Sequence, residues 1–234
     1  MSATVSIPGR FNGPRDSGNG GYCSGVVASF VEGPAEVSLR SPAPLDTPLE
    51  VVTDGDGVVR ALDGETLVAA GKRGEVVDLD VPAPVGLDEA RTAMARYRGL
   101  HDGPFCRCFV CGLAREDALA VFAGEVEGRD LVATTWTPPE WSTDDAGAVR
   151  PEIVWSVLDC PTYFAAHIGE ELSLSFLVRF AVRIDTPVPV GREHVVIAWP
   201  IESEGRKRRA GSAILSAEGE TLAAADALLV EAKS

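Results

Sequence analysis

Residues 45–48 read Leu-Asp-Thr-Pro, and residues 184–187 read Ile-Asp-Thr-Pro, 139 positions further along the chain. A second pair follows in the same order, because residues 63–67 (Asp-Gly-Glu-Thr-Leu) return as residues 218–222 (Glu-Gly-Glu-Thr-Leu), 155 positions on. The extra 16 residues fall between the two matches, where residues 201–209 predict a longer hairpin in the second copy. Two matches in order at near-constant spacing indicate an internal duplication.

Each copy is predicted to begin with a helix, residues 21–31 in the first and 151–168 in the second. Alternating apolar residues and Gly-containing turns then predict strands. In the first copy these are 35–40, 49–53, 58–62 and 67–71, preceded by 3–7; in the second they are 173–184, 194–200, 211–216 and 222–230, preceded by 118–125 and 131–137. One helix followed by antiparallel strands, twice, predicts an α+β fold in which each long helix packs on an antiparallel sheet.

The boundaries of the two repeats follow from a linker signal. Pro82-Ala83-Pro84 ends the first repeat, which we place at residues 1–81. Residues 82–104 are predicted to form a linker containing an amphipathic helix over 88–100, with Asp88 as its N-cap. The second repeat then covers residues 105–234.

Composition excludes several classes of protein. The 234 residues are 45% hydrophobic and 24% charged, which is typical of a globular chain. A net charge of −14 argues against a nucleic-acid binder. No apolar stretch reaches the roughly 20 residues that a membrane span needs, and the start of the chain has no apolar signal core. Five cysteines, an odd number with three crowded at 106, 108 and 111, suit a reducing compartment. We therefore expect a cytoplasmic protein without membrane partners.

Three short motifs carry a resemblance. Residues 108–112 read Cys-Phe-Val-Cys-Gly, residues 18–21 read Gly-Asn-Gly-Gly, and residues 157–159 read Val-Leu-Asp. Together with the repeated helix-then-strands order, they resemble the hotdog superfamily, specifically PaaI-like acyl-CoA thioesterases, here as a tandem (double) hotdog in one chain. The resemblance implies hydrolysis of an acyl-CoA or acyl-carrier thioester. We expect no cofactor, and a homo-oligomer remains open.

Each copy keeps half of the family's constellation, in which a Gly-Gly pair opens the helix and a carboxylate follows eight residues after the first glycine. The first copy has Gly20-Gly21, but Ala28 stands at the carboxylate position. The second copy has Asp159, but Pro151 stands at the glycine position and has no N–H to donate. Eight helical residues rise about 12 Å, too far for one helix to supply both groups. Because family members pair their helices antiparallel, the resemblance implies one composite site shared between the repeats.

In that site the thioester carbonyl would face the amides at the start of the first helix, where a developing oxyanion is stabilised. The catalytic residues would be Asp159, as general base or nucleophile, with Gly20, Gly21 and Asn19 at the carbonyl. The expected substrate-binding residues, at family-like positions, are Asn12, Tyr22, Trp155, Thr162, Ser173 and Ser175.

Other interpretations stay open at this point. Asp159 lies two residues before Pro161 and could cap a second short helix, and Gly20-Gly21 could be a loop. His101, Cys106, Cys108 and Cys111 could bind a metal, joined by Cys23 or Cys160; the spacing lacks a second paired knuckle, so we expect no metal and buried, inert thiols.

The chain could also be a non-catalytic acyl or CoA-ester binder on the same fold, since losing half of each site is also what decay would produce. A hotdog hydratase ranks last, because the chain lacks an Asn-Pro and a nearby Asp–His cluster.

Overall fold

A computed structural model describes residues 2–75, 78–99 and 105–233 of the chain. The first half contains helix α1 (Gly20–Ala28) and five strands. The strands are β1 (Ser2–Val5), β2 (Ala35–Leu39), β3 (Leu49–Thr53), β4 (Val59–Asp63) and β5 (Thr66–Arg73), and a short 3-10 turn, η1, covers Gly9–Phe11. The predicted helix and strands are all present in this half, with ends shifted by a few residues.

The second half repeats this order with longer elements. Helix α3 (Pro151–Ala165) is followed by β8 (Ser175–Ile184), β9 (His194–Glu204), β10 (Lys207–Leu215) and β11 (Thr221–Glu231). Strands β6 (Gly124–Glu125) and β7 (Val132–Trp136) and the 3-10 turn η2 (Glu140–Ser142) precede α3. The β9–β10 hairpin is longer than β3–β4 and turns at Gly205 with a φ of 57°, in agreement with the extra residues of the second copy.

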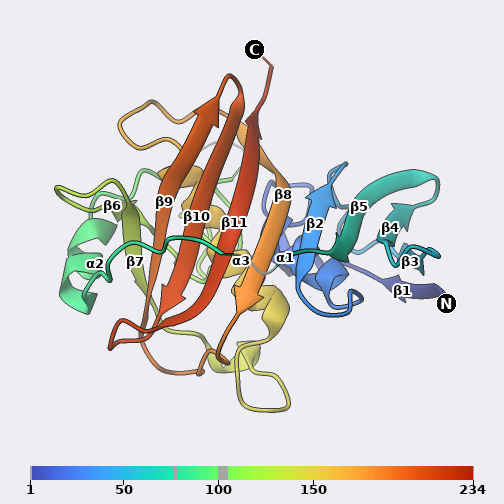
Figure 1. Ribbon diagram of the computed structural model, residues 1–234, viewed down its shortest axis with the longest axis horizontal. Helices are drawn as coiled ribbons and strands as arrows, with labels where there is room; N and C mark the ends of the chain where they lie inside the picture. Colours follow the sequence, from blue (N-terminus) through green and yellow to red (C-terminus); the bar gives the residue numbers. More distant parts are fainter. Residues whose placement is uncertain (1, 76–77, 100–104, 234) are drawn as a thin grey trace.

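Within the described residues, eleven strands form one antiparallel sheet in the order β1-β3-β4-β5-β2-β8-β11-β10-β9-β7-β6 (Figure 1). The two halves of the sheet have equivalent strand orders when each is followed outward from the centre. On one side the order is β2, β5, β4 and β3, and on the other it is β8, β11, β10 and β9. The two halves join where β2 pairs with β8, from Ala35 opposite Val182 to Ser38 opposite Arg179. This arrangement confirms the duplication, and the exact repeat boundaries stay a prediction.

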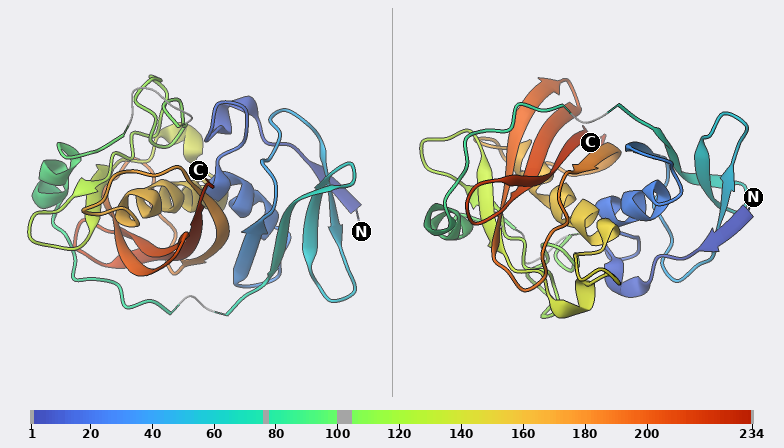
Figure 2. Two further views of the ribbon diagram at one scale, coloured as in Figure 1. Left: turned by 90° about the horizontal axis from the view of Figure 1, so that it is seen from above. Right: turned by 60° about the horizontal axis from the view of Figure 1, so that its bottom comes forward.

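Helices α1 and α3 lie side by side, and the strands of the second half curve around α3 (Figure 2). The helix is buried on nearly every side, which matches its almost continuous apolar sequence. The two helices run antiparallel, because Gly21 lies against Trp155 and Ser156 whereas Gly25, one turn later, lies against Glu152. A Cβ atom on either glycine would come within 2.6 Å of the α3 backbone. These two glycines therefore allow the two helices of the duplicated unit to touch.

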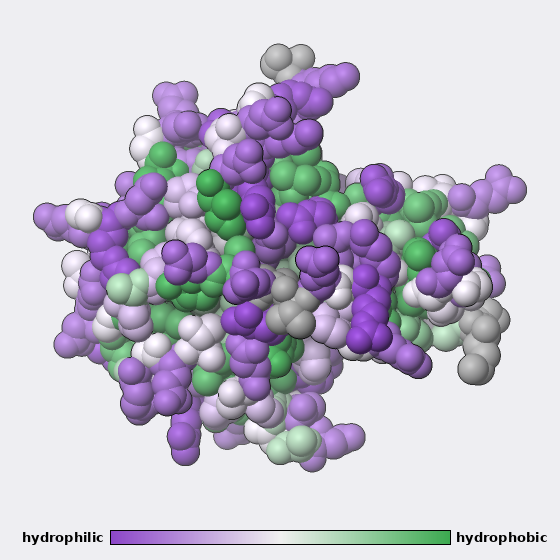
Figure 3. Space-filling view, in the orientation of Figure 1, coloured by the Kyte–Doolittle hydropathy of each residue, from purple (hydrophilic) through white to green (hydrophobic). Residues whose placement is uncertain are grey.

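The linker helix α2 (Leu87–Met94) packs on the outer face of β7 and β9. The segment that leads to it, residues 78–86, crosses in front of β9–β11 in Figure 1. Leu79 and Val81 from this segment and Ala90 and Ala93 from α2 join a second apolar cluster there, which includes Trp199. The linker therefore shields part of the sheet's second face, whose surface shows hydrophilic and hydrophobic residues interspersed in Figure 3.

Two local predictions were wrong. The linker helix starts at Leu87 with Gly86 as N-cap, and the Asp88 side chain instead accepts a hydrogen bond from Arg91 at 2.6 Å. The helix also ends earlier than expected, at Met94, and residue 100 lies outside the described residues. The strand expected over 118–125 is reduced to β6, because Leu119 and Val121 donate to the loop carbonyls of Phe109 and Val110.

Among the described residues, no helix has both the length and the apolar character that crossing a membrane requires.

Candidate active site

The start of α1 is formed by Asn19 and Gly20. Asn19 is the N-cap, and its Oδ1 accepts from the backbone N–H of Tyr22 at 2.9 Å. Gly20 is the first helical residue, so the interpretation of Gly20-Gly21 as a loop was wrong. The first amides of a helix lack partners inside the helix and favour a negative group.

Asp159 lies in the middle of α3, so it is not the cap of a second short helix. Pro161 is inside the same helix, which continues through it to Ala165. The hydroxyl of Thr162 donates to the carbonyl of Asp159 at 2.6 Å. Proline removes one backbone hydrogen bond from the helical turn before it. The sheet that surrounds α3 packs against this turn and stabilises it.

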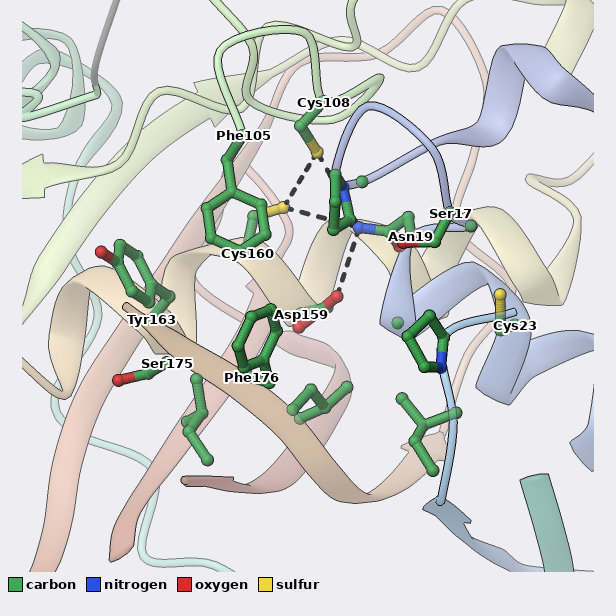
Figure 4. A pocket seen from close by; sticks show the side chains of 18 of the residues that line it. Ser17, Asn19, Cys23, Phe105, Cys108, Asp159, Cys160, Tyr163, Ser175 and Phe176 are labelled. Atoms are coloured by element: carbon green, nitrogen blue, oxygen red, sulfur yellow. Dashed lines mark hydrogen bonds between the residues drawn. The ribbon is translucent and has the colours of Figure 1, made fainter. Parts of the chain in front are cut away.

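The carboxylate of Asp159 reaches the start of α1. Its Oδ2 accepts from the backbone N–H of Gly21 at 2.8 Å and from Asn19 Nδ2 at 3.2 Å (Figure 4). These donors come from the first repeat and the acceptor from the second. The structure thus brings together the half-motifs that the sequence divided between two helices.

Burial controls the protonation of this carboxyl group. Asp159 is only 8% exposed, and desolvation raises its pKa to about 7. The hydrogen bonds from Gly21 and Asn19 oppose this shift, and the nearby Cys108 sulfur adds to it. Near neutral pH the group can therefore exchange a proton, as a general base must.

A cavity of about 360 Å³ opens beside this carboxylate (Figure 4). Four of the predicted site residues, Asn19, Gly20, Asp159 and Ser175, are on its wall. The rest of the lining is mainly apolar and sulfur-containing, and its members include Cys23, Leu39, Phe105, Cys108, Cys111, Cys160, Tyr163, Phe164, Leu172, Phe176, Leu177 and Leu229. The size and the apolar wall with few polar groups are typical of a small-molecule pocket.

Gly21 has a different position from its neighbour. The expected role of both glycines was to let substrate approach the backbone, and Gly20 does face the cavity, toward Leu39 and Leu177. Gly21 instead faces α3, and only its N–H reaches the site, through Asp159.

Three predicted binding residues near the site do not line the cavity. Trp155 lies one helical turn before Asp159, but its ring packs edge-on against Phe180 at 5.6 Å between centroids. Tyr22 stacks on Phe11, with ring centroids 4.1 Å apart. Thr162 is fully buried and bonded to its own helix.

The other two predicted binding residues, Asn12 and Ser173, do not line the cavity either. Asn12 donates to the carbonyl of Arg107 at 3.0 Å and accepts from Arg115 at 2.7 Å. The Ser173 hydroxyl lies 2.9 Å from His167 Nε2 and 3.3 Å from the hydroxyl of Ser175.

Several lining residues were not predicted from the sequence. Phe105, Tyr163 and Phe176 border the cavity from a loop, α3 and β8 (Figure 4). Tyr163 follows Asp159 by four residues, so helical spacing could have placed it on the same face. For Phe105 and Phe176 we find no sequence signal that links them to Asp159.

The two positions that lack the family's groups, Pro151 and Ala28, lie at helix ends. Pro151 is the first residue of α3 and Ala28 is the last residue of α1. Neither of them lines the cavity beside Asp159.

Only some of the cysteines considered as metal ligands lie close together in the structure. Cys108, Cys111 and Cys160 have their sulfurs within 4.8 Å of one another. Cys106 is buried but outside this cluster, and His101 lies outside the described residues. Cys23 is buried in α1, and desolvation raises the pKa of its thiol to about 12.

Solved structures share this fold over the whole chain. The tesB protein of Mycobacterium avium subspecies paratuberculosis matches with a TM-score of 0.62 over 99% of this chain and 93% of its own, at 12% identity. A candidate thioesterase II of Thermobifida fusca YX gives 0.62 over 100% and 94%, at 11% identity. A hotdog-fold protein of unknown function from Alicyclobacillus acidocaldarius gives 0.60 over 100% and 94%, at 13% identity.

No protein-family model matches the chain, and no curated protein matches it either. At these identities the structural likeness establishes the fold. The chain is a double hotdog over its full length, as its repeat and motifs predicted.

Proposed function

We propose that this protein hydrolyses acyl-CoA or acyl-carrier thioesters at one composite site between its two repeats. The observation that carries the proposal is the placement of the Asp159 carboxylate, from α3, at the amide end of α1 and on the wall of an apolar cavity. The cavity would take the acyl chain, and the polar groups at its wall would take the thioester. Fold likeness to proteins named as thioesterases supports the class of reaction by analogy.

In this mechanism, Asp159 accepts a proton from a water molecule as the water oxygen bonds to the thioester carbonyl carbon. The carbonyl oxygen becomes an oxyanion, which the first amides of α1 and Asn19 Nδ2 stabilise. The C–S bond then breaks, protonated Asp159 gives the proton it took from water to the leaving thiolate, and a carboxylic acid and a free thiol leave.

One observation favours the second candidate, a non-catalytic thioester binder. Asp159 already accepts the Gly21 N–H at 2.8 Å, a donor that an oxyanion would need. Under the hydrolase proposal the carboxylate must shift from this amide when substrate enters. Under the binder proposal it stays there as a capping group, and the cavity holds the ester unchanged.

The test is hydrolysis of short, medium, long and aromatic acyl-CoAs by the wild type, Asp159→Asn and a control, with CoA release followed by chromatography. Asp46→Asn is the matched control: Asp46 is outside the cavity lining, and its Oδ1 only accepts from Gly9 N–H at 2.9 Å, which asparagine can also do. We expect at least ~100-fold slower turnover in Asp159→Asn, the scale of a lost general base, and near wild-type turnover in the control.

Equal activity in wild type and Asp159→Asn would refute the composite site. Saturable binding of an acyl-CoA by thermal shift, with no turnover of any ester, would establish the binder instead.

A further inference from the structure

Three thiols from distant parts of the chain converge beside the active-site cavity. Cys108 and Cys111 come from the loop between α2 and β6, and Cys160 comes from α3. Their sulfurs all lie within 4.8 Å of one another, and the Cys108 and Cys160 sulfurs are 3.7 Å apart (Figure 4). All three residues are buried, at 1%, 7% and 8% exposure.

This spacing suits a metal ion. With Zn–S bonds of about 2.3 Å, two sulfurs of a tetrahedral zinc site lie about 3.8 Å apart. The observed 3.7 Å matches that edge, whereas a disulfide would bring the sulfurs to about 2.05 Å. Thiolate sulfur is also the ligand type that favours zinc over the harder cations magnesium and calcium.

The loop directs a backbone N–H at the sulfur of Cys108. The N–H of Val110 points at Cys108 Sγ, 3.4 Å away, and the N–H of Gly112 closes the turn onto the Cys108 carbonyl at 2.8 Å. A Cβ atom on Gly112 would lie 2.6 Å from the Cys108 backbone. The tight turn thus requires glycine directly after the second cysteine. The N–H that this turn directs at sulfur would form a stronger hydrogen bond with a charged thiolate than with a neutral thiol.

The side-chain amide of Asn19 also faces two of the sulfurs. Asn19 Nδ2 lies 3.9 Å from Cys108 Sγ and 3.8 Å from Cys160 Sγ. A donor outside the ligand set that faces the sulfurs is the kind of partner that orients and stabilises metal-bound groups. It also offsets part of the net negative charge that three thiolates around one divalent ion would have.

We propose that Cys108, Cys111 and Cys160 bind one zinc ion, with the fourth coordination position open to the cavity. The three protein ligands leave one position free, and all three residues line the cavity wall, so water from the cavity can fill it. The ion would tie the loop to α3 and so hold one wall of the cavity in place. This proposal is independent of the thioesterase proposal, because the sulfur cluster exists whether or not Asp159 is a base.

The experiment measures metal on the full-length protein, purified and kept under a thiol-free reductant. Zinc per chain is determined by mass spectrometry after desalting, and the chelated protein is then titrated with Co²⁺, whose thiolate charge-transfer absorption reports sulfur ligands directly. We expect one metal ion per chain and that absorption in the wild type. Cys160→Ser should weaken Zn²⁺ binding at least about 100-fold, the upper end of what losing a supporting partner alone costs.

Cys23→Ala is the matched control, because Cys23 is also buried and also lines the cavity but is outside the cluster. It should bind metal as the wild type does. If Cys160→Ser does not fold, the wild-type Co²⁺ titration decides by itself.

Three results would overturn the proposal. One is a folded, fully reduced wild type that takes up neither Zn²⁺ nor Co²⁺. Another is a Cys108–Cys160 disulfide that persists in the protein kept under that reductant. The last is Zn²⁺ binding by a folded Cys160→Ser variant as tight as by the wild type, which would place the binding elsewhere.

Discussion

Gly20 and Gly21 are neighbours at the start of α1, yet a methyl group added to each would meet very different surroundings. At Gly21 the new Cβ would lie 2.6 Å from the Trp155 carbonyl oxygen, 2.6 Å from Asp159 Cβ and 2.8 Å from Ser156 Cα. At Gly20 the nearest atoms are side-chain ends, Leu177 at 3.1 Å and Leu39 at 3.2 Å. Side-chain ends can move aside, whereas the backbone of a buried helix cannot.

The size of the effect follows from these distances. For Gly21→Ala, the 2.6 Å approach must open to about 3.4 Å, where ordinary contact begins, so α1 must move by roughly 0.8 Å. The same movement would stretch the 2.8 Å bond from Gly21 N–H to Asp159 to roughly 3.6 Å, where no hydrogen bond remains. Overpacking costs about 1–3 kcal/mol, and a lost bond to a carboxylate about 1.5–3 kcal/mol.

We therefore expect Gly21→Ala to lower the free energy of unfolding by at least about 2.5 kcal/mol. Gly20→Ala should stay within about 1 kcal/mol of the wild type, because alanine also reduces the backbone entropy lost on folding. Gly25→Ala should resemble Gly21→Ala, since its Cβ would lie 2.6 Å from Glu152 Cα. Urea unfolding of the purified proteins, followed by far-ultraviolet circular dichroism, measures all three.

A Gly21→Ala protein within about 0.5 kcal/mol of Gly20→Ala would refute this reasoning, since that difference is within ordinary surface effects. It would mean that the two helices can separate without loss, and that their close contact does not position Asp159. Failure of Gly21→Ala alone to fold would agree with the expectation.

Other perturbations test other parts of the molecule. Asp226 is buried on β11; burial would raise its pKa, but Arg209 and Arg179 hold it below the ordinary value. The ionised Asp226 therefore stabilises the folded state fully at pH values above the ordinary carboxyl pKa. This stabilisation is lost as the pH falls through the lower pKa that Asp226 has in the folded protein. Asp226→Asn should cost about 1.5–3 kcal/mol at pH 7, the range for hydrogen bonds to charged groups, and less in acid. Urea unfolding at both pH values measures this, and an equal cost at both would contradict it. Asn19→Ala should lower stability by about 1 kcal/mol through the lost N-cap, and an unchanged melting curve would contradict its capping role. Leu177→Trp, on the cavity wall, should shift substrate preference toward shorter acyl chains, and an unchanged chain-length profile would place the acyl group elsewhere.

The parts of the structure that depend on nearby residues could be read from the sequence. The resemblance placed Gly20-Gly21 at the start of a helix, and the structure adds that Asn19 caps this helix, since a capping side chain reaches only three residues ahead. Strand alternation and glycine turns gave the antiparallel strands of both halves, and the recurring Asp-Thr-Pro segments showed that the halves correspond. The contact between the first helix and Asp159 followed from a resemblance combined with helix length, since neither repeat had a complete pair of groups.

Tertiary structure decided what surrounds that contact. Trp155 has the helical spacing of a cavity residue, yet it packs on Phe180 because the curved sheet meets that face of α3. Cys160 lies beside Cys108 across 52 positions of sequence, and no local pattern connects them. These positions depend on the pairing of β2 with β8 and on the glycine contact between α1 and α3. Capping, turns and alternation act over a few residues, whereas the convergence of the carboxylate, the amide and the sulfurs requires the two repeats to dock.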